Sequence, residues 1–392
     1  MSSSVLALVG AEIFVGGSMS RGDVVIIDGR IDSCGAGIPL PVGAEAIDVT
    51  GMTILPGLID AHTHLSLGAA GHGHSEARLA YESVRRAEAF LRSGVTSVRD
   101  VGGTHNIDIE LRNAIAGGIV NGPTMQCSGQ AIVTTGGHGH MFHRVADGVD
   151  EVLKATRQQL QAGADLIKVM CSGGVFEPSE SEKWLQFTDD ELSVAIDEAR
   201  KRARPVAAHA HPAEAIKRAV RLGVSTIEHG SYVDDEAADL MAERGVPLIP
   251  TFVVYKVLSE HPEFPGLHAR ARQVYESKFD HFVRAIARGM PWGVGSDYAA
   301  MFSEPSNLVD EVEILVKVAG LSSGDVLTAA TEGNAKLMGV DDRTGAIAPG
   351  YVADLIVLDG NPVEDITALR KISATVKGGV VHKWKELTAE SR

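Results

Sequence analysis

The chain has 392 residues, of which 44% are hydrophobic, enough for a large core and for either two domains or one large α/β domain with an appendage. Its 51 acidic and 36 basic residues give a formal net charge of −15, which argues against nucleic acid or an anionic membrane as the main partner. No apolar segment is long enough to span a bilayer, and three separated cysteines without CxxC spacing indicate a reducing compartment. We therefore expect a soluble, cytoplasmic protein.

The first 54 residues are predicted to be all-β. Residues 1–9 have no basic region and only a short apolar run, which is typical of a first strand rather than of a signal peptide. Short apolar runs follow one another between glycine-containing turns, and Asp28-Gly29 between two such runs predicts a hairpin. No helical period is present in this region.

From Thr53 onwards, apolar strands alternate with amphipathic helices. The predicted strands are Thr53–His64, Val95–Val101, Thr124–Ser128, Leu166–Cys171, Val206–His211, Thr226–His229, Pro247–Thr251 and Trp292–Ser296. The predicted helices between them are Ser75–Arg92, Val149–Ala162, Asp189–Ala203, Ala213–Leu222, Asp234–Arg244 and His268–Arg288, whereas Phe252–Arg272 is interpreted as irregular. Several helices end in Gly before a short strand, as in Ala162-Gly163-Ala164, because glycine adopts the left-handed cap that other residues resist.

Eight such strand–helix units predict a (β/α)8 TIM barrel, so the fold class is α/β. Two further helices, Asn307–Ala319 and Ser322–Leu337, close this region, after which β patterns return. We expect residues 1–54 and 344–392 to form a small composite β-sandwich domain from both chain ends. Residues 55–343 are expected to form the barrel.

His62 and His64 lie two residues apart at the end of the first predicted barrel strand. Side chains at i and i+2 of a strand point the same way, and imidazole is the commonest metal ligand near neutral pH. Taken alone, the pair is more typical of two surface histidines at a strand end than of a metal site. The ends of the other strands therefore decide the interpretation.

Catalytic groups of a (β/α)8 barrel lie at the carboxyl ends of its strands. The residues at these ends include His209 and His211, then His229, and finally Asp297. Lys168 lies within the apolar fourth strand, where a buried ammonium is costly unless it loses its proton, finds an anionic partner or is modified. This ordered set across separate strands is highly specific for a metal site, although an ammonium itself cannot ligate metal.

Pro56–His64, Lys168, His209, His229 and Ser296-Asp297 resemble the amidohydrolase superfamily along essentially the whole chain. The resemblance implies that Lys168 carries a carbamate that bridges two divalent metal ions, most commonly Zn²⁺. It further implies that His62, His64 and Asp297 bind one ion and that His209 and His229 bind the other. A metal-bridged hydroxide would attack the carbonyl, and Asp297 would pass its proton to the leaving nitrogen.

Within the superfamily, Gly136–His140, Ile167–Val175 and Ile227–Tyr232 resemble a branch of carboxypeptidase-like and prolidase-like dipeptidases, ochratoxin-hydrolysing amidases and imidazolonepropionase-like proteins. The resemblance implies that Tyr232 polarises the scissile carbonyl and that a histidine of the glycine-rich loop contacts the substrate. We choose His140 for that contact over His138 and His143. His72 and His74 are interpreted as parts of a solvated loop, and His211 as a hydrogen-bonded support.

We therefore predict a binuclear metal-dependent amidohydrolase that cleaves dipeptides or N-acyl amino acids, including ochratoxin-type amides. The alternatives are an imidazolonepropionase-like hydrolase of cyclic amides, a hydrolase of other small amides or esters, and a catalytically silent homologue. The expected partner is a small-molecule amide or dipeptide, with no nucleic acid and no membrane. A homo-oligomer is expected from the resemblance alone, and the sequence does not identify the preferred side chain.

Overall fold

The computed structural model describes residues 4–68, 75–176, 180–261, 265–299 and 307–383. His72 and His74 lie outside these ranges. The described chain divides into two compact units, one within residues 1–60, 88–97 and 312–392, the other within 61–87 and 98–311. In the described ranges, no helix combines the length and the apolar composition needed to cross a bilayer.

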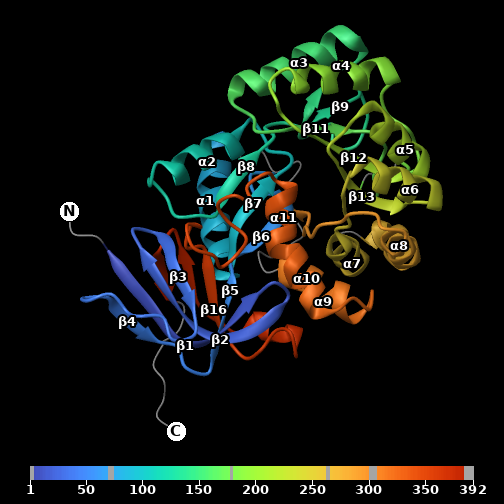
Figure 1. The fold of residues 1–392 in the computed structure, drawn as a ribbon. Coiled ribbons are helices and arrows are strands. Elements are labelled where there is room, and N and C mark those ends of the chain that lie inside the picture. The colour runs from blue at the N-terminus through green and yellow to red at the C-terminus, as the bar shows by residue number, and fades with distance from the viewer. Residues whose placement is uncertain (1–3, 69–74, 177–179, 262–264, 300–306, 384–392) are drawn as a thin grey trace. The chain divides into compact units, whose positions relative to one another are not determined.

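The first unit contains a sheet to which both ends of the chain contribute (Figure 1). Its eight strands are β1 (Val5–Val15), β2 (Ser18–Ile27), β3 (Arg30–Gly35), β4 (Glu45–Asp48), β5 (Met52–Pro56), β16 (Leu355–Asp359), β17 (Ile372–Lys377) and β18 (Val380–Lys383). They are ordered β18-β17-β16-β5-β1-β2-β3, with β4 on β1. β16 pairs antiparallel with both β17 and β5, and Leu8, Ile54 and Val357 are among the residues of the core of this sheet.

The hairpin predicted at Asp28-Gly29 is confirmed. Ile27 of β2 pairs with Arg30 of β3 in an antiparallel register. Both turn residues have positive φ, 49° for Asp28 and 78° for Gly29. Positive φ at both positions matches the right-handed twist of the two strands and requires residues that tolerate that conformation.

The second unit is built from short parallel strands and the helices that connect them. Its elements are α2 (Ile107–Ala116), β8 (Thr124–Cys127), β9 (Ile132–Val133), β10 (Arg144–Val145), α3 (Gly148–Ala162), β11 (Ile167–Met170), α4 (Asp189–Arg200), β12 (Val206–Pro212), α5 (Ala213–Leu222), β13 (Thr226–Tyr232), α6 (Asp235–Arg244), β14 (Leu248–Ile249), α7 (Phe252–Glu260), a 3-10 turn (Pro265–Leu267), α8 (His268–Ala287) and β15 (Tyr298–Ala299). Figure 1 shows α3 to α6 together on one side of β11, β12 and β13.

Four elements run across the division between the units, namely β6 (Leu58–His64), α1 (Glu76–Arg92), β7 (Val95–Asp100) and α9 (Asn307–Lys317). α10 (Ser323–Thr328), a π-helical turn (Ala329–Gly333), α11 (Asn334–Leu337) and a 3-10 turn (Ile366–Arg370) complete the first unit.

The strands of the second unit belong to two sheets, ordered β10-β9-β11-β12-β13-β14 and β15-β6-β7-β8. Backbone hydrogen bonds also connect segments of these two sheets with each other and with residues 293 and 294. Asp165 N donates to Cys127 O at 2.8 Å, Gly293 N to Leu248 O at 2.9 Å and Ala61 N to Val294 O at 3.1 Å. As a result, the carboxyl ends of β6, β11, β12 and β13 open toward one pocket.

Three predictions about elements were wrong in detail. The expected strand Thr53–His64 is two strands in different sheets, β5 and β6, separated at Gly57. Trp292–Ser296 makes only an isolated bridge from Trp292 to Leu248 before β15 begins at Tyr298. The segment expected to be irregular contains α7 and the beginning of α8, because tertiary contacts complete helices that the local pattern does not specify.

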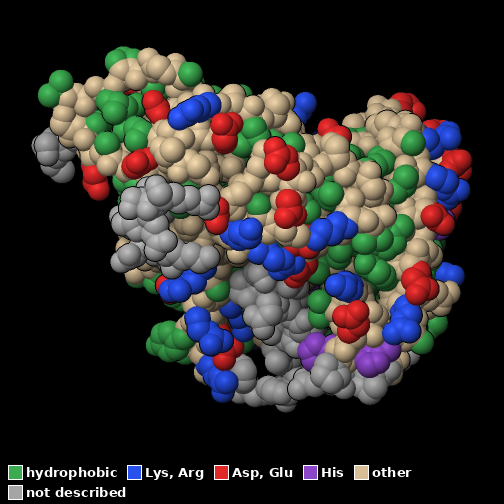
Figure 2. Space-filling model, turned by 90° about the horizontal axis from the view of Figure 1, so that it is seen from below, with side chains coloured by type: hydrophobic (Ala, Val, Ile, Leu, Met, Phe, Trp, Pro, Cys, Tyr) green, Lys and Arg blue, Asp and Glu red, His purple; other side chains and the backbone are tan. Residues whose placement is uncertain are grey.

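The surface seen in Figure 2 carries basic and acidic side chains close to one another. Ion pairs of the described chain include Arg288 with Asp239 at 2.5 Å and Lys217 with Glu236 at 2.9 Å. The excess negative charge is therefore mixed with positive charge on this face.

Candidate metal centre

β6 brings His62 and His64 to the same side of the sheet, and both imidazoles are buried. His62 Nδ1 donates to Glu228 Oε2 at 2.7 Å, and His64 Nδ1 donates to Gly102 O at 3.1 Å. The Nε2 atoms of the two rings lie 3.4 Å and 3.3 Å from Asp297 Oδ1. Hydrogen bonds on one side of each ring thus direct the other nitrogen toward Asp297.

Glu228 is a fully buried carboxylate that holds His62 in place. Its Oε1 accepts hydrogen bonds from Arg99 Nη2 at 2.7 Å and from Thr226 Oγ1 at 2.6 Å. Burial raises the pKa of Glu228, but the charge of Arg99 and the bond to His62 hold it well below its usual range. A carboxylate on the outer nitrogen of a ligating histidine fixes its tautomer and raises its basicity. Sequence reasoning assigned no role to Glu228.

His209 and His229 come from the neighbouring strands β12 and β13, and their ring centroids are 4.6 Å apart. His209 Nε2 donates to Gly173 O at 3.0 Å, and His229 Nδ1 is 2.8 Å from Thr251 Oγ1. His211 is hydrogen-bonded as expected, with Nδ1 2.8 Å from Ser231 Oγ. Burial lowers the pKa of all three rings well below the ordinary value, so they are neutral and each keeps a lone pair for a ligand.

Lys168 lies on β11 with only 1% of its surface exposed, and it lines the same pocket. Burial lowers the pKa of Lys168 to about 8, although the charges of Glu228 and Asp297 oppose this shift. A substantial fraction of its amine is therefore neutral near pH 8. A neutral amine is nucleophilic and a protonated one is not.

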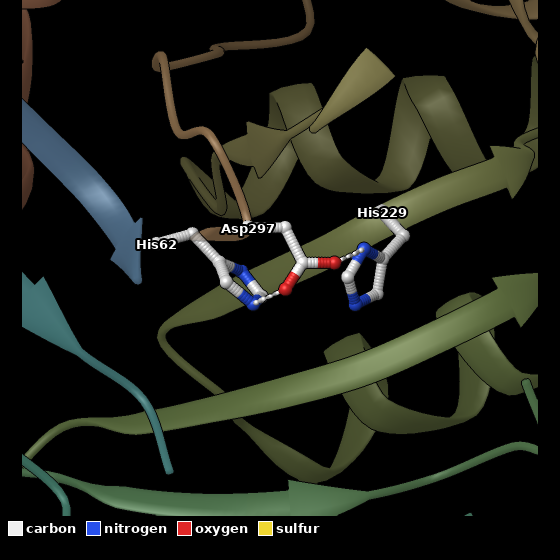
Figure 3. A group of neighbouring side chains, drawn as sticks. All are labelled: His62, His229 and Asp297. Atoms are coloured by element: carbon white, nitrogen blue, oxygen red, sulfur yellow. Dashed lines mark ion pairs between the residues drawn. The ribbon is translucent and has the colours of Figure 1, made fainter. Parts of the chain in front are cut away.

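Asp297 stands between His62 of β6 and His229 of β13 (Figure 3). Its backbone has φ of 51°, and its Oδ2 lies 3.8 Å from His229 Nδ1. Burial raises the pKa of Asp297, but the interactions with His62 and His64 outweigh burial and hold this pKa well below its usual range, so the carboxylate stays ionised. Ligand atoms of His62, His229 and Asp297 lie within 4.8 Å of one another, close enough to hold one metal ion.

This donor set fits a divalent metal such as zinc. Neutral imidazole nitrogens and an ionised carboxylate are ligands that zinc prefers. In each of the four candidate histidines, one ring nitrogen makes a buried hydrogen bond, which leaves the other nitrogen for a metal ion; these are His62, His64, His209 and His229. Such a hydrogen bond is usual for metal-binding histidines. The residues predicted as ligands are therefore brought together and oriented.

The pocket above these residues contains about 750 Å³ of space not filled by protein atoms, part of it open to solvent. Besides the candidate ligands, the described lining residues are Leu67, His138, Gly139, Phe142, His143, Met170, Val175, Phe176, His211, Val254, Tyr255, Leu258 and Ala299. Such a mostly apolar wall with a few convergent polar groups is typical of a small-molecule site.

Two predicted substrate-contact residues are not among the described lining of this pocket. His140 is exposed, with Nδ1 3.0 Å from Gly137 O. The Tyr232 hydroxyl donates to Glu182 Oε1 at 3.0 Å. By contrast, His138 lines the pocket, stacks on His209 with ring centroids 4.5 Å apart and has Nδ1 3.1 Å from Glu180 Oε2.

Tyr255 also lines the pocket, and sequence reasoning missed it. It lies on α7, almost fully buried, with its ring centroid 6.0 Å from that of His211 and 6.3 Å from that of His229. The local pattern carries no signal for this placement, because it depends on contacts with His211 and His229, which are distant in the sequence.

Comparison with known proteins agrees with this site. Residues 53–382 match the Amidohydrolase family. Ochratoxinase from Aspergillus niger is 32% identical over 374 residues, which span 85% of this chain and 74% of that protein. A solved Xaa-Pro dipeptidase with methionine in its active site has a TM-score of 0.90 at 31% identity, covering 97% of this chain and all of that one. A solved prolidase in complex with N-methylphosphonate-L-proline has a TM-score of 0.89 at 35% identity, with the same coverage.

The chain therefore belongs to the amidohydrolase family and has the α/β fold of these structures. It is a hydrolase that acts on amide bonds, and metal binding is typical of its family.

Proposed function

We propose that this chain is a binuclear metal-dependent amidohydrolase that releases a free amino acid from dipeptides or N-acyl amino acids. The observation that carries the proposal is the convergence of four buried histidines, Lys168 and Asp297 on one pocket. The similarity to an ochratoxinase and to two solved dipeptidase-type enzymes supports this substrate class.

In the proposed site, His62, His64 and Asp297 hold one ion, and His209 and His229 hold the other. Lys168, once its neutral amine had added CO₂ and released a proton, would supply anionic carbamate oxygens to the ions. When bound, the two ions activate water and polarise the scissile carbonyl. The buried, partly neutral amine of Lys168 supports this modification.

Asp297 is the proposed proton carrier. Its carboxylate is ionised and lies beside His62 and His64. We propose that it accepts the proton of the attacking water and delivers it to the leaving nitrogen, so that amide and water become a carboxylic acid and an amine.

We assign the substrate contacts from the residues that line the pocket. Of the three loop histidines, we now favour His138, since it lines the pocket and Glu180 orients its ring. For Tyr232 to polarise the carbonyl, its hydroxyl has to leave Glu182. The apolar wall, which includes Phe142, Met170 and Leu258, favours a large apolar group next to the scissile amide.

We also propose that the second unit is a closed (β/α)8 barrel and that the two chain ends build a separate β-sandwich domain. Backbone hydrogen bonds that join β8 to the start of β11, β14 to residues 291–293, and residue 294 to β6 support closure of the barrel. The pairing of β16 with β5 supports the composite domain.

The test is release of amino acids from a panel of dipeptides and N-acyl amino acids by zinc-loaded protein. The panel combines each of several apolar and charged acyl groups with a basic, an aromatic, an aliphatic and a prolyl residue as the amino acid to be released. We expect release from apolar acyl donors. The Asp297→Asn variant should keep most of its metal and lose about 10²–10⁴-fold in kcat, the usual contribution of a positioned acid–base group.

Absence of release from every compound, with two metals bound per chain, would exclude this substrate class. Full turnover by Asp297→Asn would remove Asp297 from the proton-transfer role.

A further inference from the structure

The turn after β14 places a threonine in an unusual conformation beside His229. Thr251 has φ of 50° and ψ of 52°, the left-handed region that β-branched residues strongly disfavour. It occupies the N-cap position of α7, yet its side chain makes no capping hydrogen bond. Instead, its hydroxyl lies 2.8 Å from His229 Nδ1. An unfavourable backbone conformation at this position therefore coincides with a contact to a candidate metal ligand.

The capping role that threonine usually performs is taken over by Glu311 of α9. Its Oε1 accepts from Phe252 N at 2.9 Å, and its Oε2 accepts from Val253 N at 2.7 Å. Glu311 is completely buried, and a carboxylate at a helix N-terminus is favoured by the helix dipole. With these two N–H groups satisfied by Glu311, the Thr251 hydroxyl is not needed as a cap.

A buried lysine holds the other side of the same turn. Lys278 of α8 is 1% exposed, and its Nζ donates to Pro250 O. The same ammonium lies 4.4 Å from the ring centroid of Tyr255 and 5.1 Å from that of Phe252. Residues 250, 252 and 253, on both sides of Thr251, are thus held from two different helices.

We propose that Glu311 and Lys278 are positioning residues, which hold Thr251 left-handed so that its hydroxyl fixes His229 Nδ1 and leaves Nε2 as the ligand nitrogen. We call Glu311 and Lys278 the turn clamp. The inference rests on the proposed role of His229 as a metal ligand. Lys278 also contacts Tyr255, which lines the pocket, so the tests below separate an effect through Thr251 from an effect through Tyr255.

The first test compares Thr251→Val, which keeps the shape but removes the hydroxyl, with Thr251→Ser, which keeps the hydroxyl. Zinc affinity is measured by competition with a chromophoric chelator, and the visible absorption spectrum of the Co²⁺-loaded protein reports the ligand geometry. We expect Thr251→Val to weaken one of the two zinc sites by about 10–100-fold, the usual effect of losing such a support, and to alter the Co²⁺ spectrum. Thr251→Ser should retain both properties.

A matched control is Thr156→Val, because Thr156 is equally buried and its hydroxyl bonds only to Val152 O within α3. It should change thermal stability but neither zinc affinity nor the Co²⁺ spectrum.

The second test is a double-mutant cycle. Glu311→Gln and Lys278→Met are each combined with Thr251→Val, and Glu313→Gln serves as control, because Glu313 lies on the same helix but pairs with Lys317 and Arg370. If the clamp acts through Thr251, each clamp variant weakens zinc binding in the wild-type background and adds little in the Thr251→Val background. Glu313→Gln should leave zinc affinity unchanged in both.

Additive losses in the two backgrounds would overturn the clamp, as would unchanged zinc affinity and an unchanged Co²⁺ spectrum in Thr251→Val. If the wild-type protein itself binds no zinc, the proposed metal function fails, and that result is distinct from failure of the clamp alone.

Discussion

Buried hydrogen bonds select which nitrogen of each site histidine faces the pocket. In His62, His64 and His229 the partner is at Nδ1, provided by Glu228, Gly102 O and Thr251. In His209 the bond is at Nε2, to Gly173 O, so this ring presents Nδ1. The protein therefore prepares a mixed set of ring nitrogens, and replacing the Thr251 side chain should act on metal affinity rather than on overall folding.

We expect replacement of Lys168 by alanine to remove the proposed bridging ligand. The metal content of the Lys168→Ala variant should fall from two ions per chain to one or fewer. A small carboxylate such as acetate should restore part of this metal content, because it supplies a similar anionic oxygen. Metal content after gel filtration, with and without acetate, measures this. Full occupancy in Lys168→Ala without acetate would contradict a carbamate bridge.

The sequence allowed the candidate ligands to be predicted but not their supports. His62, His209 and Asp297 stand at ends of extended segments, where the barrel rule locates function. Glu228 and Tyr255 could not be assigned roles, because the first contacts residues 166 and 129 positions away and the second lies on an unpredicted helix. Choosing among His138, His140 and His143 similarly required the path of the loop.

At the scale of elements, close backbone approaches position the histidines as much as side-chain contacts do. A Cβ at Gly295 would lie 2.6 Å from Ile249 Cγ2, 2.7 Å from His62 Cβ and 2.9 Å from His62 N. The segment Trp292–Ser296 can therefore pass beside β6 only because residue 295 has no side chain.

Gly295→Ala should consequently push this segment away from His62. We expect a loss of about 1–3 kcal/mol in the free energy of unfolding, as for other overpacked positions, together with weaker zinc binding. The control is Gly266→Ala, where a Cβ would meet nothing within 4 Å, so stability should change by no more than about 0.5 kcal/mol. Urea unfolding and zinc titration measure both effects, and equal behaviour of the two variants would contradict the close approach.

Elements with strong local signals were predicted well. Helices that precede Gly163, Gly223 and Gly245 end where expected, and each glycine has the positive φ of a left-handed cap. α7 was missed because its N-terminus is capped by Glu311, 59 residues from Phe252, rather than by a local residue. The predicted strand Trp292–Ser296 was overestimated because the hydrogen bonds of this segment to β6 and β14 do not form a continuous ladder.

At the scale of the whole molecule, all candidate ligands belong to the second unit. Zinc at 1,000-fold above its dissociation constant would stabilise that unit by about 4 kcal/mol per site. We therefore expect a chelator to increase hydrogen exchange in β6, β12 and β13, while exchange in β1 and β2 stays unchanged. Mass spectrometry of the exchanged protein tests this, and a uniform increase over both units would contradict it.

The pairing of β5 with β16 has a consequence for synthesis on the ribosome. Pro56 pairs with Leu355, so β5 waits for its partner while about 300 further residues are made. At roughly 5–20 residues per second, this delay lasts on the order of 15–60 s. During that interval the apolar edge of β5 is open to mispairing with other nascent chains, and a chaperone that shields nascent strands should raise the yield of folded protein.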